Sequence, residues 1–232
     1  MILGFDTSMP VTAACLVCDD GRAFGAPPPS PERLLGPPAH SAELLPALAG
    51  LLERAAADWG DVRRLAVGVG PGTFTGLRIG VATARALAHA LQLGISPVSS
   101  LGALAAGLAE GAGGGRPLVP LIDARRREVF AALYRANVAE PEWGPLALPP
   151  KELLARIAAA GDAPLAAGDW ALESRSDLEA AGAIVPSADS GLHAVNALHV
   201  CRLAEAIDPL PPDEVTPVYV RLPDAEINKR NA

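Results

Sequence analysis

The chain has 232 residues, half of them hydrophobic, and a formal net charge of -7 at pH 7. This length and composition can bury a sizeable core, as one large domain or two small ones. The negative charge argues against a protein that binds nucleic acid on its own. The three cysteines provide no disulfide framework, so we expect Cys15 and Cys18 of the C-x-x-C pair to be buried thiols. The apolar run at residues 1–5 is too short for a signal peptide or membrane span, which favours a cytoplasmic protein.

The first half of the chain predicts strands followed by alternating helices and strands. Residues 2–6 form an apolar strand that ends on Asp6, and residues 11–18 and 22–26 return as two further strands. A helix is predicted over residues 41–57, with Pro46 expected to kink it or delay its start. The next predicted elements are a strand at 65–69, a helix at 74–91, a strand at 95–99, a helix at 101–108 and a linker at 111–115.

The second half repeats the opening pattern 117 residues later, where an apolar strand at 118–122 ends on Asp123. A turn and a returning strand at 128–134 follow, and overlaying Asp6 on Asp123 places Ala14 on Ala131. The remaining predicted elements are a helix at 152–159, a strand at 165–167, a short helix at 177–181 and a strong helix at 192–207. This order predicts an α/β protein with the duplicated fold of actin, sugar kinases and the Hsp70 ATPase. We expect two lobes, residues 1–110 and the smaller 111–232, with helix 192–207 packing back on the first lobe.

The segment 67–80 holds the densest motif, with glycines at 70, 72, 76 and 80. It contains no lysine for a P-loop, and its glycine spacing misses the dinucleotide fingerprint. Gly76, Gly80 and Ala84 recur every four residues and therefore share one helix face. That face either packs inside the molecule or admits a helix of another protein. In the second case it forms a partner interface together with the stripe of Leu44, Leu48 and Leu52.

Three motifs give a family resemblance: Phe5-Asp6-Thr7-Ser8, His40-Ser41, and the glycine-rich run 70–80, supported by residues 217–221. With these the chain resembles the TsaB family, which takes part in threonylcarbamoyl-adenosine synthesis on tRNA. The resemblance implies a non-catalytic subunit that acts beside a TsaD-like catalytic paralogue, on the adenosine following the anticodon of tRNAs that read codons beginning with A. It further implies a TsaE-like P-loop ATPase as a partner, contact with tRNA through the complex, and a homodimer when the paralogue is absent.

The residues themselves favour a protein without a metal or catalytic site. The catalytic paralogue carries an H-x-x-x-H metal pair, and in the matching segment Ser100 and Leu104 stand at those positions. The four histidines are too widely spaced for two of them to share a helix turn. His40, at the start of a predicted helix, has no nucleophile elbow around it and is expected to hold a loop.

A vestigial nucleotide site remains possible where the fold family positions phosphate and magnesium. Its candidate residues are Asp6, Thr7, Ser8, Gly70, Gly72 and Asp123. The alternative, which we favour, is that Asp6 and Asp123 only accept backbone hydrogen bonds in their turns. Nucleotide would then bind only at the interface with the partner, and the chain would have no cofactor of its own. The rival functions are an independent ATPase or small-molecule kinase of the same superfamily, and a homodimeric interaction protein with an unrelated partner.

Overall fold

The computed structural model describes residues 1–112, 115–135, 138 and 140–221. Its strands are β1 (Ile2–Asp6), β2 (Ala13–Val17), β3 (Ala23–Gly25), β4 (Arg64–Gly70), β5 (Ile95–Ser99), β6 (Leu118–Asp123), β7 (Val129–Leu133), β8 (Trp143–Leu148) and β9 (Leu165–Ala167). Its α-helices are α1 (Pro31–Leu34), α2 (His40–Ala55), α3 (Phe74–Leu91), α4 (Ser100–Ala112), α5 (Pro150–Ala160), α6 (Asp169–Glu173), α7 (Arg175–Ala180) and α8 (Ala197–Ala204). Three short 3-10 helices are η1 (Trp59–Asp61), η2 (Gly191–His193) and η3 (Pro212–Glu214).

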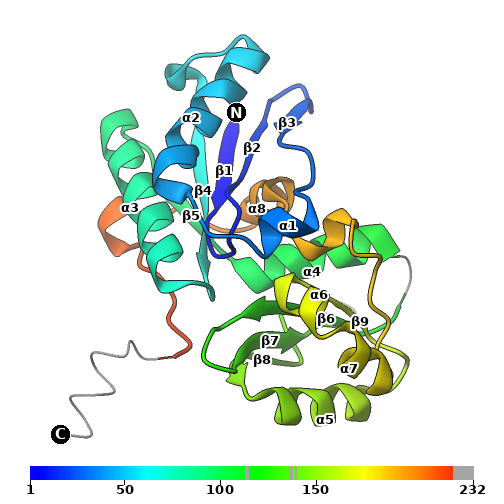
Figure 1. The fold of residues 1–232 in the computed structure, drawn as a ribbon. Coiled ribbons are helices and arrows are strands. Elements are labelled where there is room, and N and C mark those ends of the chain that lie inside the picture. Colours follow the sequence, from blue (N-terminus) through cyan, green and yellow to red (C-terminus); the bar gives the residue numbers. More distant parts are fainter. Residues whose placement is uncertain (113–114, 136–137, 139, 222–232) are drawn as a thin grey trace, which may run out of the picture.

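Two mixed sheets form the framework of the molecule (Figure 1). The first has the strand order β3-β2-β1-β4-β5, in which β1 runs antiparallel to β2 and parallel to β4. The second has the order β8-β7-β6-β9, with β6 antiparallel to β7 and parallel to β9. The order β3-β2-β1-β4 thus recurs as β8-β7-β6-β9, and this is the duplicated α/β arrangement that the sequence predicts.

The repeat differs from the sequence overlay by one residue after the first turn. Phe5 pairs with Ala14 in the first sheet, whereas Ile122, its equivalent 117 positions later, pairs with Phe130. The structural counterpart of Ala14 is therefore Phe130, and the predicted match to Ala131 is wrong. The cause is a turn shorter by one residue in the second hairpin, and a slip of one residue moves a side chain to the opposite face of a strand.

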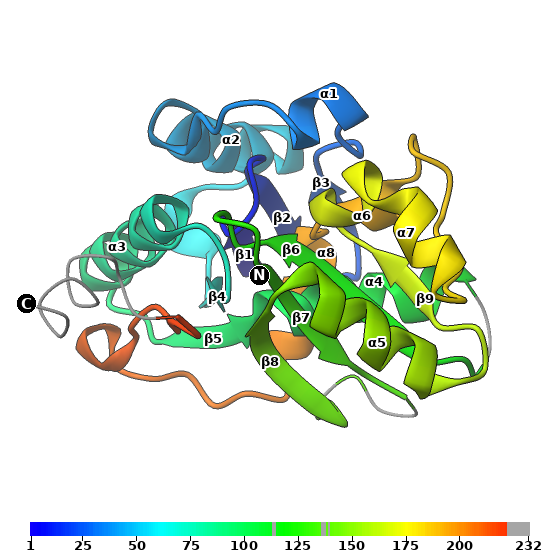
Figure 2. The same ribbon diagram turned by 60° about the horizontal axis from the view of Figure 1, so that its bottom comes forward.

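Helices cover both faces of the first sheet, and one helix lies between the two sheets (Figures 1 and 2). α2 and α3 lie side by side on one face, where they pack against β1, β2 and β4. α8 covers the other face, and α4 fills the space between the two sheets by packing on both. α5 and α7 close the far side of the second sheet. None of the helices in the described ranges is long and apolar enough to cross a bilayer.

The predicted helix 192–207 is wrong in its extent. The structure has η2, then three non-helical residues, and α8 begins only at Ala197. Asn196 causes the late start because its side chain accepts a hydrogen bond from the backbone N–H of Leu198, which makes it the N-cap. α8 packs against β1 and β2, so this late segment of the chain returns to the first sheet. The division of the chain at residue 110 stays a prediction.

Other elements match the sequence to different degrees. The helix at 74–91 and the strand at 95–99 are confirmed, and α2 starts at His40 with Pro46 inside it, so Pro46 does not delay the helix. β8 was not predicted because its Gly144 and Pro145 are typical of turns, although an edge strand tolerates proline. The predicted linker 111–115 overlaps the end of α4, and its residues 113 and 114 lie outside the described residues.

Candidate functional site

The carboxylate of Asp6, at the end of β1, is buried and accepts three hydrogen bonds from the protein. Oδ1 accepts from the backbone N–H of Ser8 at 2.7 Å and from the Ser8 hydroxyl at 2.5 Å. Oδ2 accepts from the hydroxyl of Ser100 at 2.6 Å, and Asp6 is only 1% exposed. A Cβ added at Gly68 would lie 1.8 Å from the same oxygen, so β4 passes close behind it. Asp6 therefore holds the turn between β1 and β2, as aspartate commonly does.

The glycine face of α3 packs against this same turn. A Cβ at Gly76 would lie 2.0 Å from the carbonyl oxygen of Thr7, and one at Gly80 would lie 2.3 Å from Thr7 Oγ1. The hydroxyl of Thr7 donates to the carbonyl of Gly76 at 2.7 Å, and the backbone N–H of Thr73 donates to the carbonyl of Ser8 at 2.8 Å. The glycines are needed because the backbone of the turn between β1 and β2 approaches the helix too closely for side chains.

The six residues predicted to form the partner interface are buried inside the chain, so the prediction that they form a surface for a partner is wrong. Gly76, Gly80 and Ala84 are buried against the chain's own first sheet and turn. Leu44, Leu48 and Leu52 are buried in the core between α2 and that sheet. The outward faces of the two helices instead carry side chains such as Leu45, 52% exposed, and Phe74, 40% exposed. The repeat of small residues was a correct indication of close packing, but the packing is intramolecular.

His40 begins α2 and also contacts the first turn. Its Nδ1 lies 2.8 Å from the hydroxyl oxygen of Thr12, and burial lowers the pKa of its imidazole. The side chain is only 3% exposed. Such a histidine holds the turn against the helix, in line with the loop-holding role expected from the sequence.

Asp123 lies at the corresponding end of β6, but it is partly exposed. Its carboxylate accepts from the backbone N–H of Arg125 at 2.7 Å and forms a 2.9 Å ion pair with the guanidinium of that residue. Behind it, the buried Asp169 accepts from the backbone N–H of Asp123 at 2.9 Å. Burial, with a smaller effect of the nearby Asp123 charge, raises the pKa of Asp169 to about 7. Residues 125–127, all arginines with positive φ, form the exposed tip of this hairpin.

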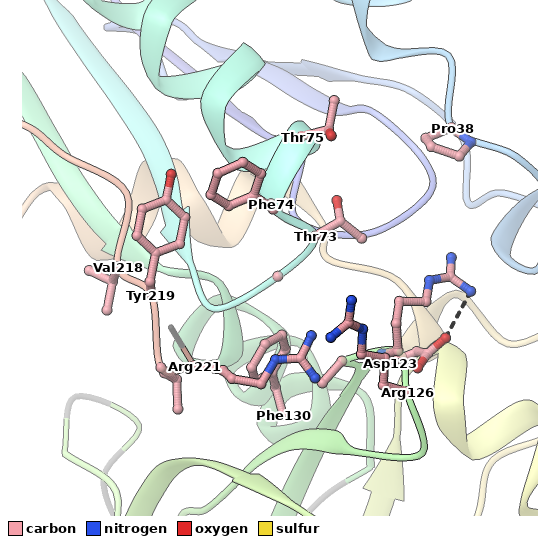
Figure 3. Close-up of a pocket in the computed structure, with 14 residues that line it drawn as sticks. Pro38, Thr73, Phe74, Thr75, Asp123, Arg126, Phe130, Val218, Tyr219 and Arg221 are labelled. Carbon is pink, nitrogen blue, oxygen red and sulfur yellow. Dashed lines mark hydrogen bonds and ion pairs between the residues drawn. The ribbon is translucent and has the colours of Figure 1, made fainter. Parts of the chain in front are cut away.

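A cleft of about 540 Å³ separates this hairpin from the start of α3 (Figure 3). The start of α3 forms one wall, with Phe74 and Thr75 in view, and the hairpin tip forms the opposite wall. The C-terminal segment closes one side, where the Arg221 side chain pairs with Glu128 at 2.7 Å. The cleft is lined by Pro38, Gly72, Thr73, Phe74, Thr75, Asp123, Ala124, Arg125, Arg126, Phe130, Val218, Tyr219, Val220 and Arg221.

The C-terminal wall is held to α3 by a cluster of aromatic and cationic groups. The rings of Phe74 and Tyr219 lie 5.2 Å apart, and the Arg78 guanidinium sits over the Phe74 ring at 3.9 Å. Arg78 Nε also donates to the hydroxyl of Tyr219 at 3.2 Å. The backbone N–H of Val218 donates to the carbonyl of Val69, which ties the segment to the end of β4. The sequence offered residues 217–221 only as a family marker, so their position at the cleft was not predicted.

Chemically, the cleft favours an anionic group. The first turn of a long helix carries partial positive charge from its unpaired N–H groups, and Thr73 caps α3 without a side-chain hydrogen bond. Of the six candidate nucleotide-site residues, only Gly72 and Asp123 line this space; Asp6, Thr7 and Ser8 are buried behind it, and Gly70 is not in its lining. Within the described part of the chain, no group of three or more His, Cys, Asp and Glu side chains could hold a metal ion.

Comparison with known proteins relates the chain to proteins named for the threonylcarbamoyl modification of tRNA adenosine. The family model described as TsaD, tRNA N6-adenosine threonylcarbamoyltransferase, matches residues 36–142. The tRNA threonylcarbamoyladenosine biosynthesis protein TsaB of Bacillus subtilis is 41% identical over 96 residues, which are 41% of each chain. The protein of the same name from Escherichia coli is 36% identical over 138 residues, 59% of this chain and 55% of the relative. The chain therefore spans only about half the length of these curated relatives.

Two solved structures from Pseudomonas aeruginosa match over nearly the whole fold. One is described as an uncharacterized protein with similarity to peptidase YeaZ; it is 30% identical with a TM-score of 0.75, covering 95% of this chain and 99% of its own. The other, described as YeaZ, is 27% identical with a TM-score of 0.74, covering 94% of this chain and 98% of its own.

Proposed function

The chain belongs to the TsaB family, also called YeaZ, and from this we propose that it takes part in adding the threonylcarbamoyl group to tRNA. We propose further that it is a non-catalytic subunit that activates a TsaD-like transferase. The modified base would be the adenosine that follows the anticodon in tRNAs reading codons that begin with A. The site of action would be the cytoplasm, together with a TsaE-like P-loop ATPase.

The observation that carries the non-catalytic role is the state of Asp6. Fold relatives that process nucleotides need an acid at this position to reach magnesium and water. Here both carboxylate oxygens already accept short hydrogen bonds from Ser8 and Ser100, and the group is 1% exposed. The opposing acid, Asp123, is paired with Arg125. These contacts of the two acids support the proposal of a non-catalytic role.

Reconstitution tests the proposal. We would combine the chain with the TsaD-like and TsaE-like proteins of the same genome, tRNA and a threonylcarbamoyl donor, and measure modified adenosine. Modification should require this chain, and the chain alone should transfer nothing. Asp6→Asn, which keeps an acceptor for the turn, should retain activation in the complex. Transfer or ATP hydrolysis by the isolated chain that Asp6→Asn abolishes would contradict the proposal and favour the independent ATPase or kinase.

The partner surface is proposed to be the outward face of α2 and α3. Leu45 is the most exposed large apolar side chain on α2, and Phe74 is exposed at the start of α3. Apolar groups of this kind at the surface of paired helices suit association with another helix pair. Without the paralogue, the same face would support a homodimer.

Leu45→Arg tests this surface because it adds charge without removing core contacts. We expect unchanged unfolding but loss of the complex with the transferase in size-exclusion chromatography. Ile184→Arg is the matched control, since Ile184 is 42% exposed and pairs with Leu165 at the second sheet, whereas α2 and α3 pack on the first. Equal binding by both variants would place the interface elsewhere.

Nucleotide is proposed to bind only when the partner is present, and tRNA only through the complex. The cleft between the 125–127 hairpin and the start of α3 carries arginine side chains on its hairpin side, and we propose that a partner completes its open side. Calorimetry with ATP and ADP should detect binding to the complex and none to the isolated chain. A gel shift should likewise give tight tRNA binding only for the complex, since the net charge of the chain is -7.

A further inference from the structure

A notch in the first sheet brings two cysteines together that lie far apart in the sequence. Gly4 on β1 is paired directly with Cys15 on β2, so both positions face the same side of the sheet. A Cβ added at Gly4 would lie 2.5 Å from Sγ of Cys201, which is on α8. The missing side chain at Gly4 thus gives the Cys201 thiol a place beside Cys15.

The side chains of Cys15 and Cys201 are buried next to each other. The Cys201 thiol donates to the backbone carbonyl oxygen of Cys15 at 3.7 Å and to that of Ile2 at 3.9 Å. Cys15 is 2% exposed and Cys201 is fully buried, and with Ala197 they form a small cluster of their own. Both are free thiols. Cys18, the other half of the C-x-x-C sequence, is buried in a different cluster, on the α2 side of the sheet.

The contact makes the two sulfurs chemically unequal. The interaction with Cys201 lowers the pKa of the Cys15 thiol; burial opposes this shift, and the charge of Arg202 adds to it. The same interaction and burial raise the pKa of Cys201. Cys15 is therefore the better nucleophile, because the thiolate is the reactive form, and Cys201 is suited to resolve its oxidised product.

We propose that Cys15 and Cys201 are a redox modification site whose oxidant is a peroxide and whose product is a disulfide that joins α8 to β2. The Cys15 thiolate attacks one oxygen of hydrogen peroxide, the O–O bond breaks, and the departing hydroxide takes up a proton to become water. Cys15 then carries a sulfenic acid. The Cys201 sulfur attacks the Cys15 sulfur, the S–O bond breaks, and the hydroxyl leaves with the Cys201 proton as a second water. Two thiols are oxidised and one peroxide is reduced.

The bond would fix a helix that otherwise rests on the sheet through packing. α8 has only eight residues and contacts β1, β2, β4 and β5 as well as α4. Because the bridge closes a loop between residues 186 positions apart, it would restrict the unfolded chain strongly. To form the bridge, the two sulfurs must come to about 2.05 Å from each other, the length of a disulfide bond.

The test is oxidation of the full native chain with hydrogen peroxide, followed by alkylation and non-reducing peptide mapping. We expect a Cys15–Cys201 crosslink with loss of two hydrogens, an alkylated Cys18, and a Tm at least about 5 °C above that of the reduced chain. A thiol reductant should reverse both changes. Cys18→Ser, the matched control, should retain the crosslink, and Cys201→Ser should abolish it.

Other products would overturn the proposal. These are a Cys15–Cys18 bridge, a disulfide between two chains, or sulfinic acid without a crosslink. A native chain that stays reduced at a peroxide concentration that oxidises the urea-unfolded chain would overturn it as well. If Cys201→Ser fails to fold, the peptide map of the oxidised chain with its native sequence still shows whether Cys15 and Cys201 are crosslinked.

Discussion

The hydroxyl of Ser100 donates a 2.6 Å hydrogen bond to the carboxylate of Asp6, across 94 positions of sequence. The hydroxyl oxygen of Ser100 in turn accepts a hydrogen bond from the backbone N–H of Gly70 at 3.2 Å. One side chain at the start of α4 thus ties together the ends of β1 and β4. Ser100 stands where the resemblance places the first histidine of the catalytic paralogue, and here that position serves the turn.

Ser100→Ala should destabilise the fold. It removes a hydrogen bond to a buried carboxylate and leaves the N–H of Gly70 without its partner, which together cost about 2–3 kcal/mol. Urea denaturation measures the loss as a lower midpoint at unchanged slope. Ser41→Ala is the control, since Ser41 is exposed on α2, and it should change stability by less than about 0.5 kcal/mol. Equal stability of the two variants would refute the role of Ser100.

Three glycine-to-alanine changes separate close packing from helix propensity. Gly50→Ala meets no atom within 4 Å and should stabilise α2 by about 0.5–1 kcal/mol. Gly76→Ala drives a methyl group into the Thr7 backbone and should destabilise the chain by about 1–3 kcal/mol. Gly80→Ala should fall between them, because it displaces only the Thr7 side chain.

Thermal unfolding of the three variants gives the order. A Gly76→Ala variant as stable as Gly50→Ala would mean that the turn between β1 and β2 can move away from α3. Gly80→Leu, which adds far more volume at the same contact, should be destabilised beyond Gly80→Ala. A Gly80→Leu variant that is fully stable yet unable to bind the transferase would indicate that the glycine face of α3 contacts the partner after all.

Asp169→Asn should change how stability depends on pH. Burial raises the native pKa of Asp169 to about 7 from 3.8, so between about pH 4 and 7 the native state holds the proton that the unfolded state has released. The contribution of Asp169 to the free energy of unfolding is therefore greatest below pH 4. It falls as the pH rises toward 7, by at most about 4 kcal/mol. The asparagine variant lacks this decline, so its advantage over the native chain should grow across that range.

Chemical denaturation at a series of pH values between 4 and 8 provides the measurement. Asp208→Asn, at an exposed acid, is the control and should track the native chain. A constant difference between Asp169→Asn and the native chain at all pH values would contradict the prediction.

Phe74 and Tyr219 should show a coupling energy. Their rings are 5.2 Å apart, and aromatic pairs contribute about 0.5–1.5 kcal/mol beyond buried area. A double-mutant cycle with Phe74→Ala and Tyr219→Ala measures the term by denaturation. Phe24→Ala combined with Tyr219→Ala is the control, because Phe24 lies on the opposite edge strand of the first sheet, and its effects should add. No coupling in the first pair would mean that the C-terminal segment does not depend on ring contact.

The sequence predicted long periodic elements well and contacts between distant segments poorly. α3 was predicted to the residue because its apolar period and the turn before it agree. The 192–207 helix was overextended because apolar periodicity continues through the break that the Asn196 cap imposes. Asn196 can be recognised as the cap only from the structure, where its backbone is extended and its side chain accepts from the N–H of Leu198.

The candidate site shows the same limit. Asp6 and Asp123 were correctly placed at strand ends. Their surroundings differ because of Ser100 and Arg125. The hydroxyl of Ser100, 94 positions away in the sequence, donates to the buried Asp6, whereas the nearby Arg125 forms an ion pair with Asp123. The meeting of Cys15 with Cys201 is equally invisible in the sequence, where only Cys18 stands nearby.

The placement of α8 has a consequence for synthesis on the ribosome. Ala66, Val98 and Cys15, on the face that α8 covers, belong to strands completed by Ser99, whereas α8 ends at Ala204, 105 positions later. At about 5–20 residues per second, translation needs roughly 5–20 s to cover that distance. During this interval the nascent first sheet presents an apolar face that its own helix has not reached. We therefore expect the part of this face that α8 covers to stay exposed in the nascent chain until α8 has been synthesised.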